Sequence, residues 1–276
     1  MFVDPKYRPE DFDLTYLKLV YEELEEYLDS SIETIGFRYW QARENQDSLR
    51  QKKVESAGNE DVVLEYYQST KQYLYELSHQ DATKNYQRKF SIVKSLLSIN
   101  NMEKMLDYGG GIGGLTIFIT KSEYRCDYLD VAGSYTFEYA KYRFQKREIN
   151  CNMIPHNVAI EKLPKSNYDL ITSFDCLEHV FDLEETIERI AYMLKNNGIF
   201  LTSSTFRGGK IHLLRNNKYS DIKTFNSLLS KYCLDFESRY LKYFFLPKSL
   251  CRIMLKTPLR TYFSPSGHLL LYRKRR

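Results

Sequence analysis

Hydrophobic residues in the first hundred positions recur at intervals of three and four, which is the spacing of one face of an α-helix. Between Leu14 and Leu28 the apolar positions alternate with four glutamates, so an amphipathic helix is expected there. The same spacing predicts helices at about 60–78 and 85–98, the second capped by Asn85. The first hundred residues are therefore predicted to be mainly helical.

From Lys104 onward the pattern changes to short apolar runs that end in Gly or Asp and alternate with helical stretches. A helix is expected at 182–195, with Asp182 as N-cap, Glu185 completing a capping box and Asn196-Asn197-Gly198 as its stop. The strand-like runs are KMLDYG, CDYLDV, YDLITSF and GIFLTSS, followed by a last strand in GHLLLYRKRR.

Strands that alternate with helices predict an α/β fold with a doubly wound, mostly parallel sheet and helices on both of its faces. We expect this core at 101–276 and a helical N-terminal cap, which binds the acceptor of the reaction inferred below, at 1–100.

The composition indicates a folded globular protein, since 43% of the 276 residues are hydrophobic and 28% are charged. No apolar run approaches the roughly 18 residues of a membrane-spanning helix, and MFVDPKYRPEDFD lacks the pattern of a secretory signal. The five cysteines are scattered and form no CxxC pair, which indicates neither a disulfide framework nor a zinc site. We therefore expect a cytoplasmic protein without a transmembrane segment.

The net charge of +4 conceals a gradient, because residues 201–276 contain 16 Lys and Arg against three Asp and Glu. A basic block of this kind suits an anionic partner, or it serves only to keep the protein soluble. The aromatic and basic segment 240–263 is compatible with capping a site or with peripheral contact to an anionic membrane surface. Pro247 and Pro258 argue against one long amphipathic helix in this segment.

A glycine-rich run, DYGGGIGG, follows the first strand-like segment and precedes the helix-like LTIFIT. A strand, a glycine turn and a helix bring backbone N–H groups close to a ligand, because glycines have no side chain to hold it away. Asp130 ends the next strand, where a carboxylate can accept hydrogen bonds from two ribose hydroxyls. A nucleotide-like ligand is expected. The run also contains GxGxxG, so a dinucleotide site and a tight turn without ligand are the alternatives.

The acid before the first glycine, together with SFDCLEHV after a later strand and LKNNGIF after the next helix, resembles the class I S-adenosylmethionine-dependent methyltransferases. The resemblance covers about residues 60–205, and the LEHV element is similar to that of ubiquinone-type O-methyltransferases. It implies a Rossmann-like sheet, S-adenosylmethionine as cofactor and S-adenosylhomocysteine as product. The resemblance places the methionine part of the cofactor on Asp107, Gly109, Gly111 and Gly113, the ribose on Asp130 and the adenine against Val131.

Further cofactor contacts are implied less directly by the same resemblance. Relatives often supply an acid to the adenine amino group at a position where this chain has Ala159, so the backbone there or Asn157 would make the contact. Phe174, directly before Asp175 at the end of a strand, is a further expected cofactor contact. Tyr73 is another, since it lies in the region that closes over the cofactor in similar enzymes.

Asp175, Glu178 and His179 would cluster if the chain makes one helical turn after the YDLITSF strand. His179, with an ordinary pKa of about 6.5, would serve as a general base toward the acceptor, and Glu178 and His212 are the other candidate catalytic residues. Alternatively the three residues hold a divalent metal, as in the ExxEH arrangement of ubiquinone-type and small-RNA terminal ribose methyltransferases. Asp175 is shorter than the glutamate of those relatives, so we expect no metal. In a third interpretation LEHV is only structural.

His212 is the second histidine expected at the mouth of the site, after the fifth strand. Arg207, Lys210 and Arg215 around it can bind the carboxylate or phosphate of an acceptor, or they form a solvated basic loop.

The sequence therefore predicts a biosynthetic enzyme that O-methylates a small molecule or short peptide, with an anionic acceptor matching the basic block; N-methylation remains open. Two alternatives are an RNA-end ribose methyltransferase and a methyltransferase-like subunit that binds without turnover. The chain has no separate RNA-binding module, so nucleic acid is not the expected partner.

Overall fold

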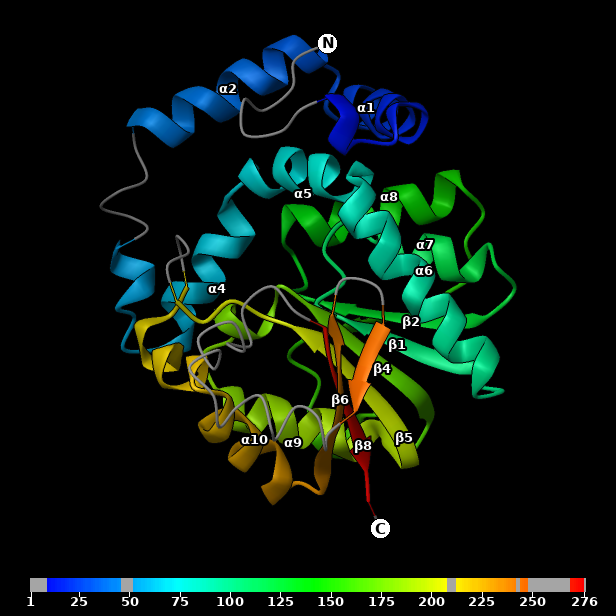
Figure 1. Cartoon of the computed structure of the whole chain (residues 1–276). Coiled ribbons are helices and arrows are strands. Elements are labelled where there is room, and N and C mark those ends of the chain that lie inside the picture. Colours follow the sequence, from blue (N-terminus) through cyan, green and yellow to red (C-terminus); the bar gives the residue numbers. More distant parts are fainter. Residues whose placement is uncertain (1–8, 46–51, 208–211, 242–243, 248–268, 276) are drawn as a thin grey trace. The chain divides into compact units, whose positions relative to one another are not determined.

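The computed structural model describes residues 9–45, 52–207, 212–241, 244–247 and 269–275 (Figure 1). The chain divides into two compact units. Unit 1 comprises Met1–Gln51, Leu64–Met102 and Gly110–His156, and unit 2 comprises Lys52–Val63, Glu103–Gly109 and Asn157–Arg276. The chain passes from one unit to the other inside the glycine turn, whose first residues belong to unit 2 and whose later residues belong to unit 1. The proposed division at residue 100 stays a prediction.

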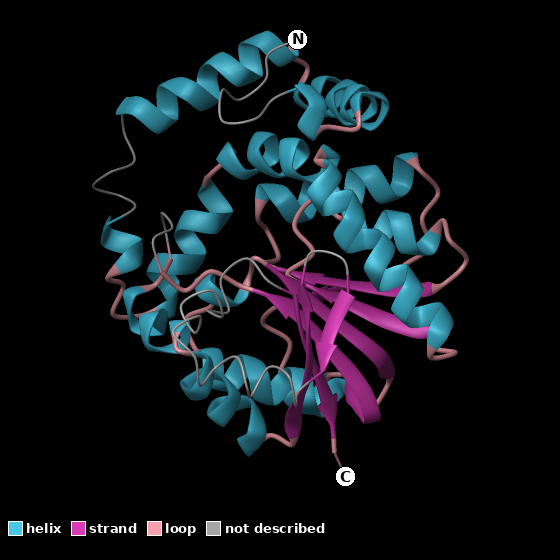
Figure 2. Ribbon diagram, viewed as in Figure 1, coloured by secondary structure: helices cyan, strands magenta, loops and turns pink. Residues whose placement is uncertain are grey.

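The strands form an eight-stranded sheet in the order β3-β2-β1-β4-β5-β8-β6-β7 (Figure 2). β1 pairs with β4, β4 with β5 and β2 with β3 in parallel, whereas the pairs made by β8, β6 and β7 are antiparallel. The predicted α/β fold is confirmed, and the expected last strand is β8. The strands are β1 (Lys104–Tyr108), β2 (Arg125–Asp130), β3 (Met153–Pro155), β4 (Tyr168–Phe174), β5 (Leu194–Ser203), β6 (Leu234–Leu241), β7 (Phe244–Pro247) and β8 (Leu269–Lys274).

Unit 1 is built from helices that pack around α5. α1 lies against α5, which also contacts α2, α6 and α8, and α7 packs on β2. The apolar stripe of α1 enters this core, where Leu17 and Leu24 are fully buried. The helices are α1 (Leu14–Leu28), α2 (Ile32–Asn45), α5 (Gln72–Ala82), α6 (Lys84–Ile99), α7 (Gly114–Thr120) and α8 (Tyr135–Lys146), while α4 (Glu60–Ser69) crosses the boundary between the units.

Two expectations about the N-terminal helices were wrong. The stretch 60–78 is not one helix, because α4 ends at Ser69 and α5 begins at Gln72. Thr83, not Asn85, caps α6: its backbone is extended, with φ −70° and ψ 141°, and its hydroxyl accepts a hydrogen bond from the Tyr86 N–H at 3.3 Å. Asn85 lies inside the helix, where the backbone cannot adopt the extended conformation that an N-cap requires.

In unit 2, α9 (Leu183–Met193) packs against β5, and α10 (Ile222–Lys231) packs against β6. Asp182 caps α9 as predicted, its carboxylate accepting a hydrogen bond from the Glu185 N–H at 2.9 Å. The helix ends at Met193 rather than at residue 195, because β5 begins at once and takes the Asn-Asn-Gly run into the strand. Short 3-10 helices, η2 (Ile160–Lys162), η3 (Leu177–His179) and η4 (Leu214–Ser220), complete the connections.

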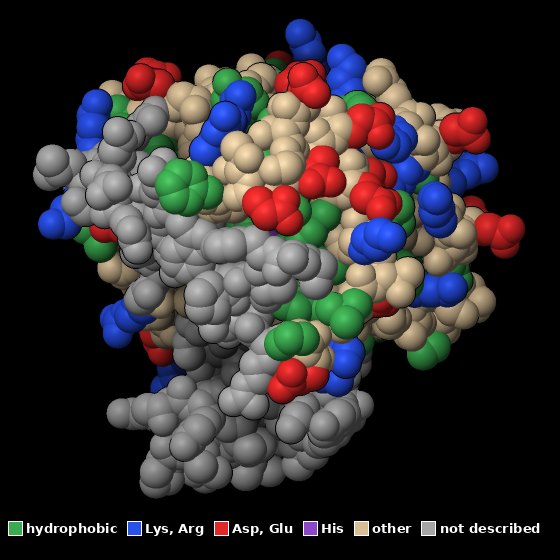
Figure 3. Space-filling model, turned by 90° about the horizontal axis from the view of Figure 1, so that it is seen from above, with side chains coloured by type: hydrophobic (Ala, Val, Ile, Leu, Met, Phe, Trp, Pro, Cys, Tyr) green, Lys and Arg blue, Asp and Glu red, His purple; other side chains and the backbone are tan. Residues whose placement is uncertain are grey.

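No helix among the described residues is both long and apolar enough to span a membrane. Acidic and basic side chains alternate over the described part of the face that is shown in Figure 3.

Candidate functional site

In unit 1, two side chains of β2 fasten the later half of the glycine turn. One carboxylate oxygen of Asp130 accepts a hydrogen bond from the Gly111 N–H, and the other accepts one from the Val131 N–H, each at 2.6 Å. The Tyr128 hydroxyl donates to the Gly111 carbonyl oxygen at 2.6 Å. Gly111 and Gly113 have φ angles of 56° and 76°, in the left-handed region that favours glycine. The turn therefore enters α7 in a defined conformation beside a carboxylate.

The Asp130 carboxylate occupies an electrostatically unfavourable place. Burial raises its pKa to about 6 from an ordinary 3.8, even though the hydrogen bonds from Val131 and Gly111 act to lower it. This shift corresponds to about 3 kcal/mol of destabilisation of the charged form relative to an ordinary aspartate. A perturbed acid beside a glycine turn is typical of a binding site, because a ligand that donates hydrogen bonds offsets the cost of the charge.

His156, which bonds the backbone beside Asp130, is a residue that the sequence analysis missed. Its backbone N–H donates to the Asp130 carbonyl oxygen at 3.0 Å, and its imidazole Nδ1 accepts a hydrogen bond from the Ala132 N–H at 3.3 Å. The available signal was its position, since it follows the last residue of the short strand β3.

Tyr73 belongs to an aromatic cluster in unit 1. Its ring stacks on that of Tyr67 with 5.5 Å between centroids and meets the Tyr66 ring edge-on at 6.4 Å. Burial, followed by the neighbouring Tyr67 and Tyr66, raises the pKa of Tyr73 well above 10, so its hydroxyl stays protonated at neutral pH. Its contact with a cofactor stays a prediction.

In unit 2, the earlier half of the glycine turn leaves the end of β1. Asp107 is buried, and the Thr172 hydroxyl on β4 lies 3.4 Å from its carboxylate oxygen Oδ1. Gly109 has φ of 73°, and a Cβ at this position would overlap Sγ of Cys176 and lie 2.7 Å from that residue's Cβ. The turn backbone therefore lies directly against Cys176, at a distance that only glycine allows.

The segment after β4 makes a short helical turn, but this turn begins only at Leu177 and does not include Asp175. Phe174 ends β4, and Asp175 then adopts a left-handed conformation, with φ of 49°. The Asp175 N–H donates to the Ser203 carbonyl oxygen at 2.7 Å, and η3 follows. A left-handed conformation is uncommon for a residue other than glycine, and such conformations concentrate at functional sites.

Glu178, His179 and His212 come together in unit 2, with their ligating atoms within 4.8 Å of one another. The rings of His179 and His212 meet edge-on with 4.9 Å between centroids. Glu178 is only 1% exposed, and its Oε1 accepts a hydrogen bond from the Thr205 N–H at 2.9 Å. All three residues predicted as catalytic thus form one cluster. Asp175, one of the three alternative metal ligands in the sequence analysis, is absent from this group of possible ligands. His212 stands in the group in place of Asp175.

The electrostatics of this cluster favour a neutral His212 imidazole. Burial, then the charge of His179, lowers the pKa of His212 below 6.5. Burial, then the charge of Asp175, raises the pKa of Glu178. In the described part of the chain, the buried atoms Glu178 Oε2 and His212 Nδ1 have no hydrogen-bond partner. Buried polar atoms normally have one, so this pair is suited to a ligand.

Of the remaining predicted residues of unit 2, those that the structure describes lie at the surface. Asn157 and Ala159 are exposed just before η2, and their contact with an adenine stays a prediction. Arg207 and Arg215 are exposed, and the Arg215 guanidinium lies 4.0 Å from the centroid of the Phe181 ring. Lys210 and most of segment 240–263 lie outside the described residues.

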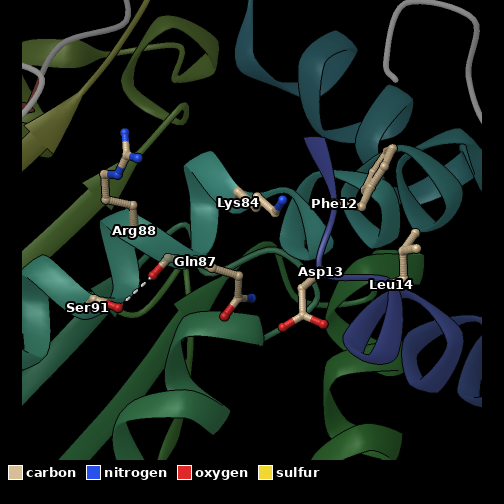
Figure 4. Close-up of a pocket in the computed structure, with 7 residues that line it drawn as sticks. All are labelled: Phe12, Asp13, Leu14, Lys84, Gln87, Arg88 and Ser91. Carbon is tan, nitrogen blue, oxygen red and sulfur yellow. Dashed lines mark hydrogen bonds between the residues drawn. The ribbon is translucent and has the colours of Figure 1, made fainter. Parts of the chain in front are cut away.

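A separate groove of about 640 Å³ lies in unit 1 between the start of α1 and the first half of α6 (Figure 4). Within it the Ser91 hydroxyl donates to the Gln87 carbonyl oxygen at 2.9 Å. None of the predicted site residues lines the groove, whose lining consists of Phe12, Asp13, Leu14, Lys84, Gln87, Arg88 and Ser91.

Comparison with known proteins identifies the fold. The profile of a family described as "Methyltransferase domain" matches residues 71–256. An O-methyltransferase family protein from Burkholderia thailandensis is similar in structure, with a TM-score of 0.54, 12% identity and coverage of 88% of this chain and 70% of that chain. An S-adenosylmethionine-dependent methyltransferase from Clostridium acetobutylicum gives a TM-score of 0.49, 12% identity and coverage of 69% and 92%. No curated protein matches the sequence.

Proposed function

This chain belongs to the methyltransferase-domain family. We propose that it is an S-adenosylmethionine-dependent enzyme that O-methylates a small molecule or short peptide carrying an anionic group. The observation that carries the choice of chemistry is the cluster of buried Glu178 with half-buried His179 and His212, which can present an imidazole to an acceptor hydroxyl. Hydroxyl acceptors need such a base, since they hold their proton at neutral pH.

The cofactor is assigned to the glycine turn and the residues around it. Asp107, Gly109, Gly111 and Gly113 would hold its methionine part, and Asp130 its ribose hydroxyls. Support comes from the left-handed glycines and from the raised pKa of Asp130, which two hydroxyl donors would counteract. Contacts to the rest of the cofactor are assigned to Val131, Asn157, Ala159, Phe174 and Tyr73.

When bound, the cofactor supplies a methyl group on a positively charged sulfur, so the protein has only to orient the acceptor and remove its proton. We assign His179 as the base that takes the proton from the acceptor oxygen. Glu178, held by the Thr205 N–H, and His212, in edge-on contact with the His179 ring, keep the base in place.

The test uses His179→Ala with radiolabelled S-adenosylmethionine and a panel of hydroxy acids, hydroxylated peptides and the corresponding amines. The variant should lower kcat by roughly 10²–10⁴ on the best acceptor and leave the Kd for S-adenosylhomocysteine within about twofold. Thr186→Ser, a change of one methyl group on α9, serves as the control. A wild-type rate from His179→Ala would refute the catalytic role, and methylation of amines alone would refute O-methylation.

A metal-assisted version of the same reaction is the second candidate, favoured by the unpaired Glu178 Oε2 and His212 Nδ1. In a tetrahedral site, ligand atoms about 2.0–2.2 Å from the ion lie about 3.3–3.6 Å apart. The three ligating atoms, which lie within 4.8 Å of one another, would therefore have to close by up to about 1.5 Å. Chelator would then remove activity, and Zn²⁺ or Mn²⁺ would bind the chelator-treated protein in calorimetry. Activity on a short RNA that depends on this metal would replace the small acceptor with an RNA end.

A further inference from the structure

A buried ionic cluster joins three helices of unit 1. It consists of Glu23 on α1, Asp81 on α5, Arg143 on α8 and Arg147 just after α8. Arg143 Nε donates to Glu23 Oε2 at 3.1 Å, and Arg143 Nη1 lies 3.4 Å from Asp81 Oδ2. Arg147 Nε donates to the other oxygen of Glu23 at 2.5 Å. Arg143 is completely buried, and Glu23 and Asp81 are almost completely so. The cluster therefore fixes α1, α5 and α8 to one another.

Arg143 also bonds the glycine turn. Its Nη1 donates to the Ile112 carbonyl oxygen at 2.6 Å, the shortest of its hydrogen bonds. A peptide group is planar and trans, so fixing this carbonyl also fixes the direction of the Gly113 N–H on the opposite side of the same plane. That N–H donates to the Gly110 carbonyl oxygen at 2.9 Å and closes the turn. Arg143 thus controls the peptide on which the closure of the turn depends.

α5 and α8 also contact the turn through close packing at glycines. A Cβ on Gly113 would lie 2.5 Å from the Phe144 ring of α8, and a Cβ on Gly111 would lie 2.9 Å from Leu77 of α5. A Cβ on Gly114 would overlap the carboxylate of Asp81 itself. The same two helices that carry Asp81 and Arg143 therefore hold the turn on several sides.

Burying charged side chains in such a cluster costs free energy. Burial raises the pKa of Asp81 to about 6, despite the opposing charge of Arg143. Burial also acts to raise the pKa of Glu23, but the hydrogen bond from Arg147 and the charge of Arg143 bring it below its ordinary value. Buried ion pairs often stabilise a fold no better than apolar residues of the same volume. In some proteins such groups instead fix one specific geometry.

We propose that the buried ionic cluster is a positioning device for cofactor binding, in which Arg143 transmits the placement of α1 and α5 to the Ile112 carbonyl and so to the glycine turn. The inference rests on the proposed assignment of the cofactor to that turn. It gives α1 a role in cofactor binding that is exerted through Arg143. Arg143 is a positioning residue, and Glu23 acts through it.

The experiment compares four single variants by calorimetric titration with S-adenosylhomocysteine, at a temperature where circular dichroism shows each to be fully folded. Glu23→Gln and Arg143→Lys perturb the cluster. Glu22→Gln is the matched control, since Glu22, the residue next to Glu23 on α1, is exposed and pairs with Lys18 at the surface. Val20→Ala is the stability control, because Val20 is completely buried in α1 and takes no part in the cluster.

We expect the Kd to rise at least tenfold in Glu23→Gln and Arg143→Lys and to stay within twofold in Glu22→Gln. Val20→Ala should lower the melting temperature yet leave the Kd within twofold. If the cluster acted only through stability, Val20→Ala and Glu23→Gln would instead change the Kd alike. In the double variant Glu23→Gln/Arg143→Lys the two effects on Kd should be less than multiplicative, because both act on one network.

The possible failures are distinguishable. If the wild-type chain does not bind S-adenosylhomocysteine, the proposed cofactor site is wrong, and this inference falls with it. If the wild type binds and Glu23→Gln binds equally well, the cofactor site stands and the positioning role is refuted. If Val20→Ala raises the Kd as much as Glu23→Gln does, the cluster acts through stability alone and the positioning role is again refuted.

Discussion

Replacing Asp130 by Asn should make the protein more stable relative to the wild type as the pH rises. The same change should weaken cofactor binding. Burial raises the pKa of the carboxyl to about 6, so between pH 3.8 and pH 6 the folded protein binds more protons than the unfolded chain. The stability that this group contributes is therefore complete below pH 3.8 and is lost as the pH rises through 6. The full difference is about 3 kcal/mol, of which about 1.4 kcal/mol falls between pH 5 and pH 8.

Asparagine does not ionise, so it escapes this loss, but it replaces one of the two acceptor oxygens with a donor. That change costs about 1–3 kcal/mol at every pH, because the Gly111 or the Val131 N–H loses its partner. The informative quantity is thus the difference in unfolding free energy between variant and wild type. It should shift by about 1.4 kcal/mol in favour of the variant from pH 5 to pH 8. The titration of Asp81 cancels, because both proteins contain it.

Urea denaturation followed by far-UV circular dichroism at each pH measures this difference, and calorimetry with S-adenosylhomocysteine measures binding. Losing charged hydrogen bonds to the ribose hydroxyls should cost about 1–3 kcal/mol, which corresponds to a Kd higher by about 5- to 150-fold. A pH-independent difference in stability would refute the assigned pKa. Unchanged affinity would refute the ribose contact.

Three further predictions concern other parts of the site. Gly109→Ala should lower the free energy of unfolding in urea by about 2–4 kcal/mol, because of the left-handed φ and the overlap of the new Cβ with Cys176. Adding Cys176→Gly should restore the steric part of this loss, about 1–3 kcal/mol. The kcat/KM should fall at acidic pH with a midpoint below 6.5, because protonated His212, whose pKa burial lowers, no longer keeps His179 in place; His212→Asn should remove this contribution to the pH profile. Replacing the exposed Arg207 and Arg215 by Gln should raise the KM of an anionic acceptor and make this KM less sensitive to salt, with the Kd for cofactor unchanged. A salt-insensitive KM in the wild type would indicate an apolar acceptor instead.

The sequence was most informative where a local pattern decides the structure. Asp182 caps α9 as expected, because capping depends on residues only three positions apart. The glycine turn and Asp130 were likewise recognisable, since the turn requires left-handed backbone and the acid ends the following strand. Fold class followed from the alternation of strands and helices, which the sheet order confirms.

Contacts between distant residues could not be predicted in this way. His212 reaches Glu178 because the Leu213 N–H donates to the Glu178 carbonyl oxygen at 3.1 Å, a tertiary hydrogen bond with no local pattern. Glu23 had the pattern of an exposed acidic helix face, yet it is buried against Arg143, which lies 120 positions further along the chain. The charge of each residue was visible, but its partner depends on how the helices pack.

The most direct test of the cofactor site is a crystal structure of the complex with S-adenosylhomocysteine. The account predicts both ribose hydroxyls within about 2.6–3.2 Å of the Asp130 carboxylate oxygens, with the homocysteine part against the backbone of residues 109–113. A ligand bound elsewhere, or one whose ribose makes no contact with Asp130, would contradict it.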